Sequence, residues 1–188
     1  MIDGEPPVRR RHPARWVGAG ILVAGAALVV LLATRPSSLA TEVQTPLLGQ
    51  PAPALTGTTV TGQRFALSSL RGRWVVVNFF ASWCEPCQQE EPGLVAFAYQ
   101  HRGPAGAALV GVVYDDTTAN ARQFMTAAGA MWPALEDPGG TIAVDYGVRA
   151  PPETFIVSPG GLVVAHLDGP VTAAQLDYWL HEASEQSA

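Results

Sequence analysis

The chain has 188 residues, 48% of them hydrophobic and 14% charged, which is enough for one domain with a buried core and accessory segments. The net charge is −5, and every basic residue is an arginine. An acidic chain without a basic stripe argues against nucleic-acid binding.

Residues 16–34, "WVGAGILVAGAALVVLLAT", carry no charge. A helix of that length spans roughly 28 Å, close to the ~30 Å thickness of the bilayer hydrocarbon core. Arginines stand before the run at positions 9, 10, 11 and 15, and a basic flank of this kind stays in the cytoplasm. We therefore expect a cytoplasmic basic tail at 1–15 and a single-pass transmembrane anchor at 16–34. The alternative is a cleaved signal peptide, although the run exceeds the roughly 7–15 residues of a signal h-region.

After the anchor, the Pro-, Ser- and Thr-rich residues 35–54 predict a linker, and a folded domain is expected at 55–188. The domain begins with a hairpin and a short turn or helix in residues 57–73. The run "WVVVNFF" at 74–80 is continuous and β-branched, which is typical of a central strand buried on both faces of a sheet.

The rest of the domain alternates helices and strands. In chain order, the sequence predicts a helix at 88–102 with a kink at Pro92 and Gly93, a strand at 107–114, a helix ending near Gly129, strands at 155–157 and 162–166, and a helix at 172–186. A Ser-Pro-Gly-Gly turn joins the last two strands as a hairpin. This order predicts an α/β fold with a mixed sheet.

The only two cysteines, Cys84 and Cys87, are separated by two residues in the stretch "NFFASWCEPCQQEEP". A structural zinc site needs four ligands, and the four histidines show no ligand spacing relative to this pair. A disulfide that closes so short a loop is a poor structural staple, because the stabilisation grows with loop length. A redox role fits better, with copper transfer by the pair and a distant histidine left open.

The position of the pair supports redox chemistry. Cys84 follows the predicted strand and begins a helix, where free N–H groups and a partial positive charge stabilise a thiolate. Cys87, one turn later, is expected to be more buried and to resolve a mixed disulfide on Cys84. Trp83 would supply a flat apolar platform or simple packing. Pro86, early in the helix, loses no hydrogen bond and restricts the dithiol geometry.

These residues resemble a known family. The pattern Trp-Cys-Glu-Pro-Cys-x-x-Glu-x-Pro at 83–92, followed by "YGVRAPPETFIV", resembles the membrane-anchored thioredoxin-like proteins of cytochrome c maturation, the CcmG/DsbE, ResA and TlpA group. The resemblance covers roughly residue 47 to the C-terminus. It implies a thioredoxin-like fold, a mixed central sheet with helices on both faces, and a thiol–disulfide oxidoreductase without a cofactor or metal.

The resemblance also implies roles for single residues. A cis proline facing the cysteines falls on Pro152, or on Pro151 if the register shifts by one. Glu90 matches the family's buried acid beneath the cysteines, and Glu153 matches an acidic position beside the cis proline, counted with Trp83 and the two prolines as substrate-binding. The residue before the cis proline offers its backbone to a substrate strand, but here it is Pro151, which has no N–H.

Neighbouring acids bear on the redox direction. A carboxylate near a thiol disfavours the thiolate, and burial raises the pKa of the carboxyl group itself. Glu90 and Glu91 are adjacent, and we expect only one of them, Glu90, to be buried and to exchange protons with Cys87. Together with Glu85, it favours a reductant over an oxidant, because oxidants stabilise the thiolate.

Family members commonly reduce apocytochrome c or a partner protein outside the cytoplasm, with electrons from a membrane transporter of the CcdA/DsbD type. The sequence leaves two alternatives open, a disulfide-forming oxidant and a copper carrier. A peroxidase is disfavoured, because no Thr stands ahead of Cys84 as peroxidase sites require and a Trp directly precedes it. His101 and His166 are expected to be surface or packing residues. The "YDD" at 114–116 is expected to be a strand end followed by a helix cap.

Overall fold

The computed structural model describes Ala26 and residues 40–186. The chain divides into two units at Ser37 and Ser38, and the second unit is the one described below. Apart from Ala26, which is helical, the expected anchor at 16–34 lies outside the described residues. Among the residues that are described, no helix combines the length and hydropathy needed to span a bilayer.

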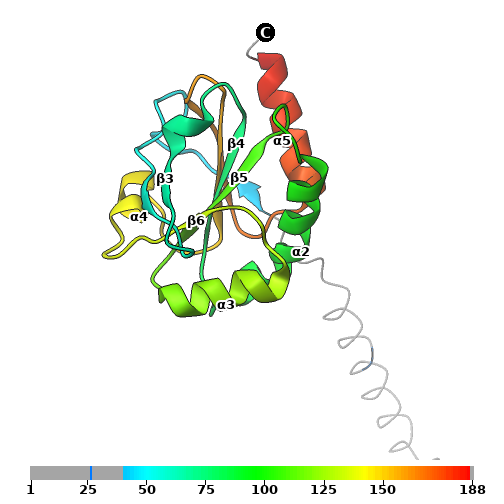
Figure 1. The fold of residues 1–188 in the computed structure, drawn as a ribbon. Helices are drawn as coiled ribbons and strands as arrows, with labels where there is room; N and C mark the ends of the chain where they lie inside the picture. The colour runs from blue at the N-terminus through cyan, green and yellow to red at the C-terminus, as the bar shows by residue number, and fades with distance from the viewer. Residues whose placement is uncertain (1–25, 27–39, 187–188) are drawn as a thin grey trace, which may run out of the picture. The chain divides into compact units, whose positions relative to one another are not determined.

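A six-stranded mixed sheet forms the centre of the domain, in the order β1-β8-β7-β4-β5-β6 (Figure 1). Its strands are β1 (Thr41–Glu42), β4 (Val75–Phe80), β5 (Ala108–Val113), β6 (Ala134–Leu135), β7 (Glu153–Val157) and β8 (Val163–Asp168). β4 runs parallel to β5 and antiparallel to β7, and every residue of β4 is buried. The expected central strand is therefore present, within one residue of its predicted start.

The two faces of the sheet are covered by different elements. The hydrophobic residues of β4 alternate: Val75, Val77 and Phe79 pack on one face, and Val76 packs on the other. The first face carries the hairpin of β2 (Thr56–Thr58) and β3 (Arg64–Ala66), the 3-10 helix η1 (Leu67–Leu70) and α4 (Thr141–Tyr146). The second face carries α2 (Glu85–Gln100), α3 (Thr118–Ala128) and α5 (Ala173–Gln186). The expected thioredoxin-like arrangement, with helices on both faces, is observed.

Residues 40–54 differ from the linker expected at 35–54. β1 pairs with β8, and Leu48 and Pro51 form isolated bridges with Val163 and Leu162. Leu47, Leu48 and Ala52 also pack against the core. The domain thus begins before residue 55. Proline-rich composition did not predict this, because the segment is held by an otherwise unpaired strand edge and by scattered apolar contacts.

Helix α2 begins directly after Cys84, as expected from the position of the cysteine pair, and continues through Pro92. Cys84 is its N-cap residue, and Pro86 lies in its first turn, where backbone N–H groups have no partner within the helix. The helix therefore begins directly at the two cysteines. Its N-terminus lies at the end of the sheet where β4 and β5 finish, next to the loop that precedes β7.

Candidate active site

The two cysteines form a disulfide at the start of α2. The backbone N–H of Cys87 points at Cys84 Sγ, 3.2 Å away. Cys84 is 4% exposed, whereas Cys87 is fully buried at 0%. When reduced, a thiolate at Cys84 has the helix N-terminus and this N–H to stabilise it. The geometry therefore suits Cys84 as the nucleophile and Cys87 as the resolving thiol.

One helical turn beyond Cys87, Glu90 is a buried acid with 2% exposure. Its Oε1 accepts a hydrogen bond from Asn78 Nδ2 (2.9 Å), and its Oε2 accepts one from the Val171 N–H (3.0 Å). Burial raises the pKa of Glu90 from 4.5 to about 8, the two hydrogen bonds oppose this rise, and the charge of Glu91 adds to it. Glu90 can therefore hold or release a proton near neutral pH.

Asn78 and Gly93 explain how the hydrogen-bond partners of Glu90 come close to it. Asn78, the only polar residue of β4, also donates to Thr154 Oγ1 at 3.1 Å. Gly93 lets the start of α5 approach α2, because a Cβ at that position would lie 3.3 Å from both Thr172 Cα and Val171 O. The acid is thus fixed by three chain segments that are far apart in sequence.

Glu91 is also buried, at 6% exposure, so the expectation that only one of the two acids is buried was wrong. Helix α2 packs against α3 as well as against α5, and a helix covered on two sides can bury adjacent positions. Glu91 Oε1 has no hydrogen-bond partner among the described residues. Burial raises the pKa of Glu91 from 4.5 to about 7.

The loop before β7 faces the disulfide. Its Pro151–Pro152 peptide bond is cis, at the position that the resemblance implies. The carbonyl oxygen of Pro151 lies 3.5 Å from Cys84 Sγ. Pro152 is buried, whereas Pro151 is partly exposed. Pro151 therefore presents a carbonyl group, but no N–H, beside Cys84.

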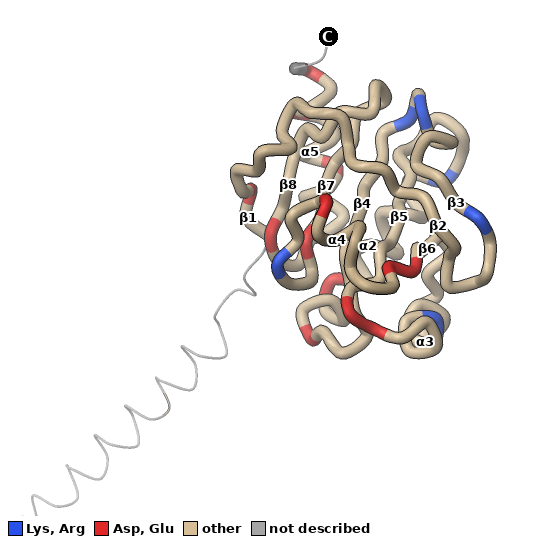
Figure 2. Tube along the Cα trace, turned by 90° about the vertical axis from the view of Figure 1, so that its left-hand side faces the viewer, with Lys and Arg blue, Asp and Glu red and all other residues tan. Residues whose placement is uncertain are grey.

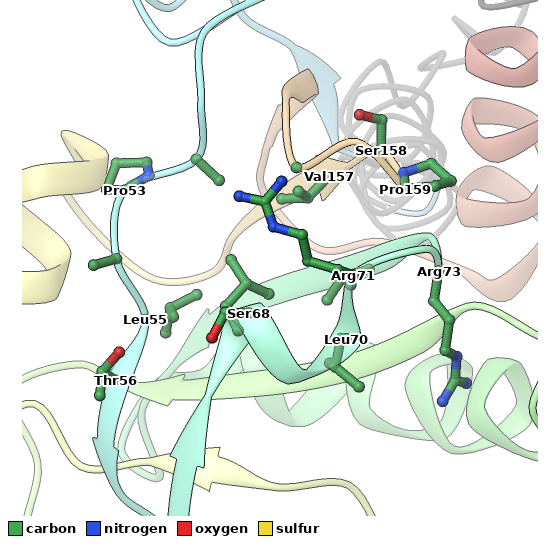
Figure 3. Close-up of a pocket in the computed structure, with 15 residues that line it drawn as sticks. Pro53, Leu55, Thr56, Ser68, Leu70, Arg71, Arg73, Val157, Ser158 and Pro159 are labelled. Atoms are coloured by element: carbon green, nitrogen blue, oxygen red, sulfur yellow. The ribbon is translucent and has the colours of Figure 1, made fainter.

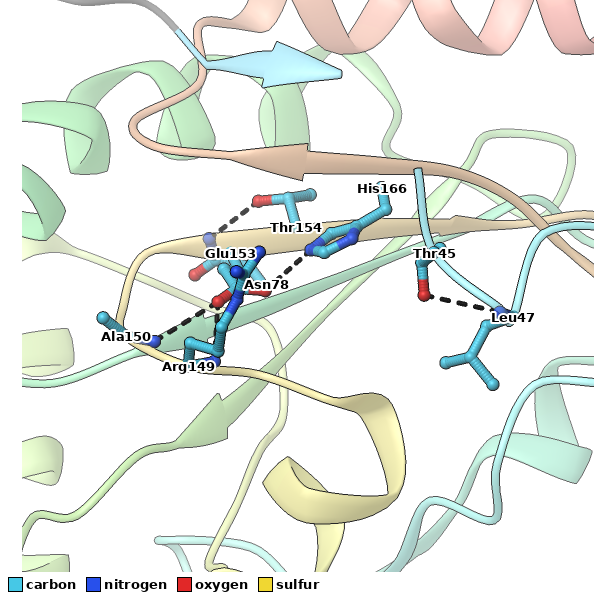
Figure 4. Close-up of polar contacts among 8 residues, drawn as sticks. All are labelled: Thr45, Leu47, Asn78, Arg149, Ala150, Glu153, Thr154 and His166. Carbon is cyan, nitrogen blue, oxygen red and sulfur yellow. Dashed lines mark hydrogen bonds and ion pairs between the residues drawn. The ribbon is translucent and has the colours of Figure 1, made fainter. Parts of the chain in front are cut away.

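Glu153 does not lie where a substrate could touch it, which corrects its expected place among the substrate-binding residues. It is 1% exposed. Its Oε1 accepts hydrogen bonds from the N–H groups of Arg149 (2.7 Å) and Ala150 (3.2 Å), and its Oε2 lies 2.7 Å from His166 Nε2 (Figure 4). Burial would raise the pKa of Glu153, but these hydrogen bonds and the His166 charge outweigh burial and lower it. Glu153 therefore positions the proline loop from inside.

The other predicted site residues surround the pair at the surface. Trp83 is 57% exposed, and its Nε1–H donates to the carbonyl oxygen of Asp115 at 3.0 Å. Its ring is therefore available as a platform beside Cys84. Glu85 and Pro86 are both exposed in the first turn of α2. Acidic residues occupy the loops around this end of the domain (Figure 2).

A separate pocket lies at the opposite end of the sheet. Val75, at the start of β4, and Val157, at the end of β7, help to line it (Figure 3). Arg71 extends over the pocket and donates to the Gly160 carbonyl at 3.1 Å. The disulfide follows the other end of β4, so this pocket takes no part in the cysteine chemistry.

Side chains that could share a metal ion gather at one place in the described part of the chain. There, the one group of three side chains close enough to share an ion is His181, Glu182 and Glu185. These residues lie in the last turns of α5 and do not include the cysteines.

Sequence reasoning missed several residues that shape the site. They are Asn78, Tyr114, Asp116, Thr154 and His166. An amide inside an otherwise apolar strand was a usable signal, since a buried Asn needs partners. His166 does pack, as expected, because it is buried and stacks on Phe155 with ring centroids 4.1 Å apart, but its contact with Glu153 was not foreseen.

Comparisons with known proteins agree with this geometry. The AhpC/TSA family profile matches residues 48–166. The chain is 35% identical over 131 residues to the thiol:disulfide interchange protein HelX of Rhodobacter capsulatus, covering 68% of this chain and 72% of HelX. It is 33% identical over 131 residues to the thiol-disulfide oxidoreductase ResA of Bacillus subtilis, covering 69% and 73%.

Among solved structures, the chain resembles a thiol:disulfide interchange protein of the thioredoxin family from Chlorobium tepidum. The TM-score is 0.66 and the sequence identity 26%, over 75% of this chain and 99% of that one. The fold, the Cys84–Cys87 pair at a helix N-terminus and these relatives agree with one another. The chain belongs to the AhpC/TSA family and is a thioredoxin-like thiol–disulfide oxidoreductase of the CxxC type.

Proposed function

We propose that the protein works as a reductant outside the cytoplasm, and that its substrate is a disulfide of apocytochrome c or of a partner that delivers electrons to it. The family resemblance supplies the substrate class. The direction rests on one observation of this chain, the buried Glu90 one turn from Cys87.

The reaction proceeds through a mixed disulfide. The Cys84 thiolate attacks one sulfur of the substrate disulfide, and the other substrate sulfur leaves as a thiolate and takes up a proton. The Cys87 thiolate then attacks Cys84 Sγ, which releases the second substrate sulfur as a thiolate that is also protonated. Two electrons and two protons reach the substrate, and the Cys84–Cys87 disulfide is formed. A membrane dithiol transporter of the CcdA/DsbD type would return the two electrons.

Glu90 favours this direction for an electrostatic reason. A strong oxidant of this fold stabilises the thiolate of its reduced form, which raises its reduction potential. Here a buried carboxyl group with a pKa of about 8 lies beside the pair, and its ionised form opposes a neighbouring thiolate. The exposed Glu85 in the first turn of α2 acts in the same sense. The reduced form is therefore not specially stabilised, and its electrons are given up readily.

The reduction potential of the Cys84–Cys87 pair tests the direction. The protein is equilibrated in thiol buffers of known potential, and the dithiol fraction is measured. We expect a value near or below that of thioredoxin, about −270 mV. A value near about −120 mV, typical of a strong oxidant, would show that the protein inserts disulfides instead.

We also propose that residues 16–34 anchor the protein in the cell membrane, with residues 1–15 in the cytoplasm and the redox domain outside. Support comes from the charge-free run and from the arginines that precede it. A C-terminal alkaline phosphatase fusion tests this placement, because that enzyme folds only in an oxidising compartment. Membrane-bound activity is expected. An inactive cytoplasmic fusion would contradict the topology, and soluble activity would indicate a cleaved signal peptide.

A further inference from the structure

The segment Tyr114–Asp116 joins β5 to α3 and lies next to both loops of the active site. The Tyr114 N–H donates to the Phe80 carbonyl at 2.8 Å, so it continues the ladder between β4 and β5 by one residue. The following residues leave the sheet just where β4 turns into the cysteine loop. Three successive residues then make separate contacts with the site.

Two of these contacts hold the loop that carries the nucleophile. Asp116 Oδ2 accepts a hydrogen bond from the Ser82 N–H at 2.8 Å, and the Asp115 carbonyl accepts one from Trp83 Nε1–H at 3.0 Å. Burial would raise the pKa of Asp116, but hydrogen bonds from Ser82, Thr117 and Asn120 outweigh it and lower the pKa, so Asp116 remains ionised near neutral pH. The two residues before Cys84 are thus both tied to this segment.

The third contact holds the facing loop. Tyr114 Oη–H donates to the Arg149 carbonyl at 3.0 Å. The Arg149 N–H in turn donates to Glu153 Oε1 at 2.7 Å. Arg149 is therefore fixed on both its backbone groups, two residues before Pro151.

The backbone of Asp115 is unusual in a way that suits this role. Its φ is +42°, the one positive φ outside glycine among the described residues. Such a conformation costs energy for a residue with a side chain, although Asp tolerates it better than most. Strained residues of this kind are concentrated at functional sites. The residue with this conformation, Asp115, is the one whose carbonyl oxygen accepts the hydrogen bond from Trp83.

We propose that Tyr114–Asp116 is a positioning segment that holds the Cys84 loop and the Pro151 loop in register with each other. By doing so it sets the rate at which the Cys84 thiolate attacks the disulfide of an extended polypeptide, forms the mixed disulfide and releases the other substrate sulfur as a thiolate. The inference deepens the oxidoreductase activity of the same site and is independent of the redox direction. It assigns a function to a segment whose sequence alone indicates only a strand end and a helix cap.

The first test separates the two loops by the size of the substrate. The rate at which the reduced full-length protein reacts is measured with two disulfide substrates. One is an oxidised peptide with the haem-attachment motif Cys-x-x-Cys-His. The other is dithiodipyridine, which is too small to pair with the Pro151 loop. Tyr114→Phe removes only the hydroxyl group that bonds Arg149. We expect the rate with the peptide to fall about fivefold, the equivalent of one hydrogen bond, and the rate with dithiodipyridine to stay within about twofold.

Tyr178→Phe is the matched control, since its ring contacts Trp179 within α5. It should leave both rates unchanged. The proposal fails if Tyr114→Phe leaves the peptide rate at the wild-type value. It also fails if the variant lowers both rates equally and lowers the melting temperature, because the segment is then only structural.

The second test addresses the Cys84 loop. Asp116→Ala removes the acceptor of the Ser82 N–H, and both rates should fall by about fivefold or more. Asp116→Asn keeps an oxygen that can accept this bond and should recover most of the loss. Equal rates for the Ala and Asn variants would overturn the role of Asp116. Because the reduction potential is measured separately, a wrong redox direction would not be mistaken for failure of either test.

Discussion

Replacing Glu91 by Gln should change how the stability of the protein depends on pH. The pKa of Glu91 is raised from 4.5 to about 7 by burial in the folded state. Between these values the folded protein keeps a proton that the unfolded chain has already lost. The free energy of unfolding therefore falls as pH rises through this window and stays low above it. At about 1.4 kcal/mol per pKa unit, the difference amounts to about 3 kcal/mol.

Urea denaturation of the oxidised protein from pH 4 to pH 8.5 measures the effect, with the disulfide intact so that no thiol titrates. Wild type should lose stability across this range because Glu90 and Glu91 both titrate. Glu91→Gln should lose about 3 kcal/mol less, and removing the Glu91 charge also lowers the pKa of Glu90, which acts in the same direction. The exposed Glu42 supplies a control, since Glu42→Gln should reproduce the wild-type profile. Parallel profiles for wild type and Glu91→Gln would refute the reasoning.

Four further changes test the geometry of the site. Glu90→Gln removes a charge that opposes the thiolate, so the pKa of the Cys84 thiol, followed by thiolate absorbance, should fall by about one unit, and an unchanged value would contradict the role of Glu90. Pro151→Ala adds an N–H beside the nucleophile and should make the mixed disulfide between Cys84 and a peptide about fivefold more stable towards exchange with a free thiol; an unaltered stability would mean that substrates do not pair there. Glu153→Gln weakens the hydrogen bonds to His166 and the proline loop and should lower the free energy of unfolding by about 1–3 kcal/mol at neutral pH, with a smaller loss at acid pH, where the wild-type carboxylate is itself protonated. Gly93→Ala places a Cβ 3.3 Å from Val171 O and should destabilise the protein by about 1–3 kcal/mol in the same assay, whereas unchanged stability would show that α5 yields easily.

The chemistry of the site was readable from sequence because it depends on local spacing. Cys84 and Cys87 are one helical turn apart, and a strand that ends just before them places the pair at a helix N-terminus. The apolar run of β4 and the turn between β7 and β8 were similarly predictable, since periodicity and turn residues act over a few positions. The position of the cis proline followed from the resemblance.

The burial of the acids could not be read in this way. Glu90 and Glu91 are neighbours in sequence, and whether one or both are buried depends on α3 and α5, which cover α2 from different sides. Glu153 was expected to contact the substrate. The alternation of side chains along β7 instead places it on a covered face of the sheet, where its carboxylate contacts His166 of β8. Only the assembled sheet brings these side chains within hydrogen-bonding distance.

The sequence by itself determined the redox pair and most strands and helices of the domain, although not β1, β6 and α4. Each feature that it determined depends on residues within one turn or one strand of each other. The tertiary structure alone decided which carboxyl groups are buried, what holds them, and that Tyr114–Asp116 touches both active-site loops. The physical reason is that desolvation and hydrogen bonding depend on neighbours in space, and those neighbours come from segments up to 81 positions apart, as between Glu90 and Val171.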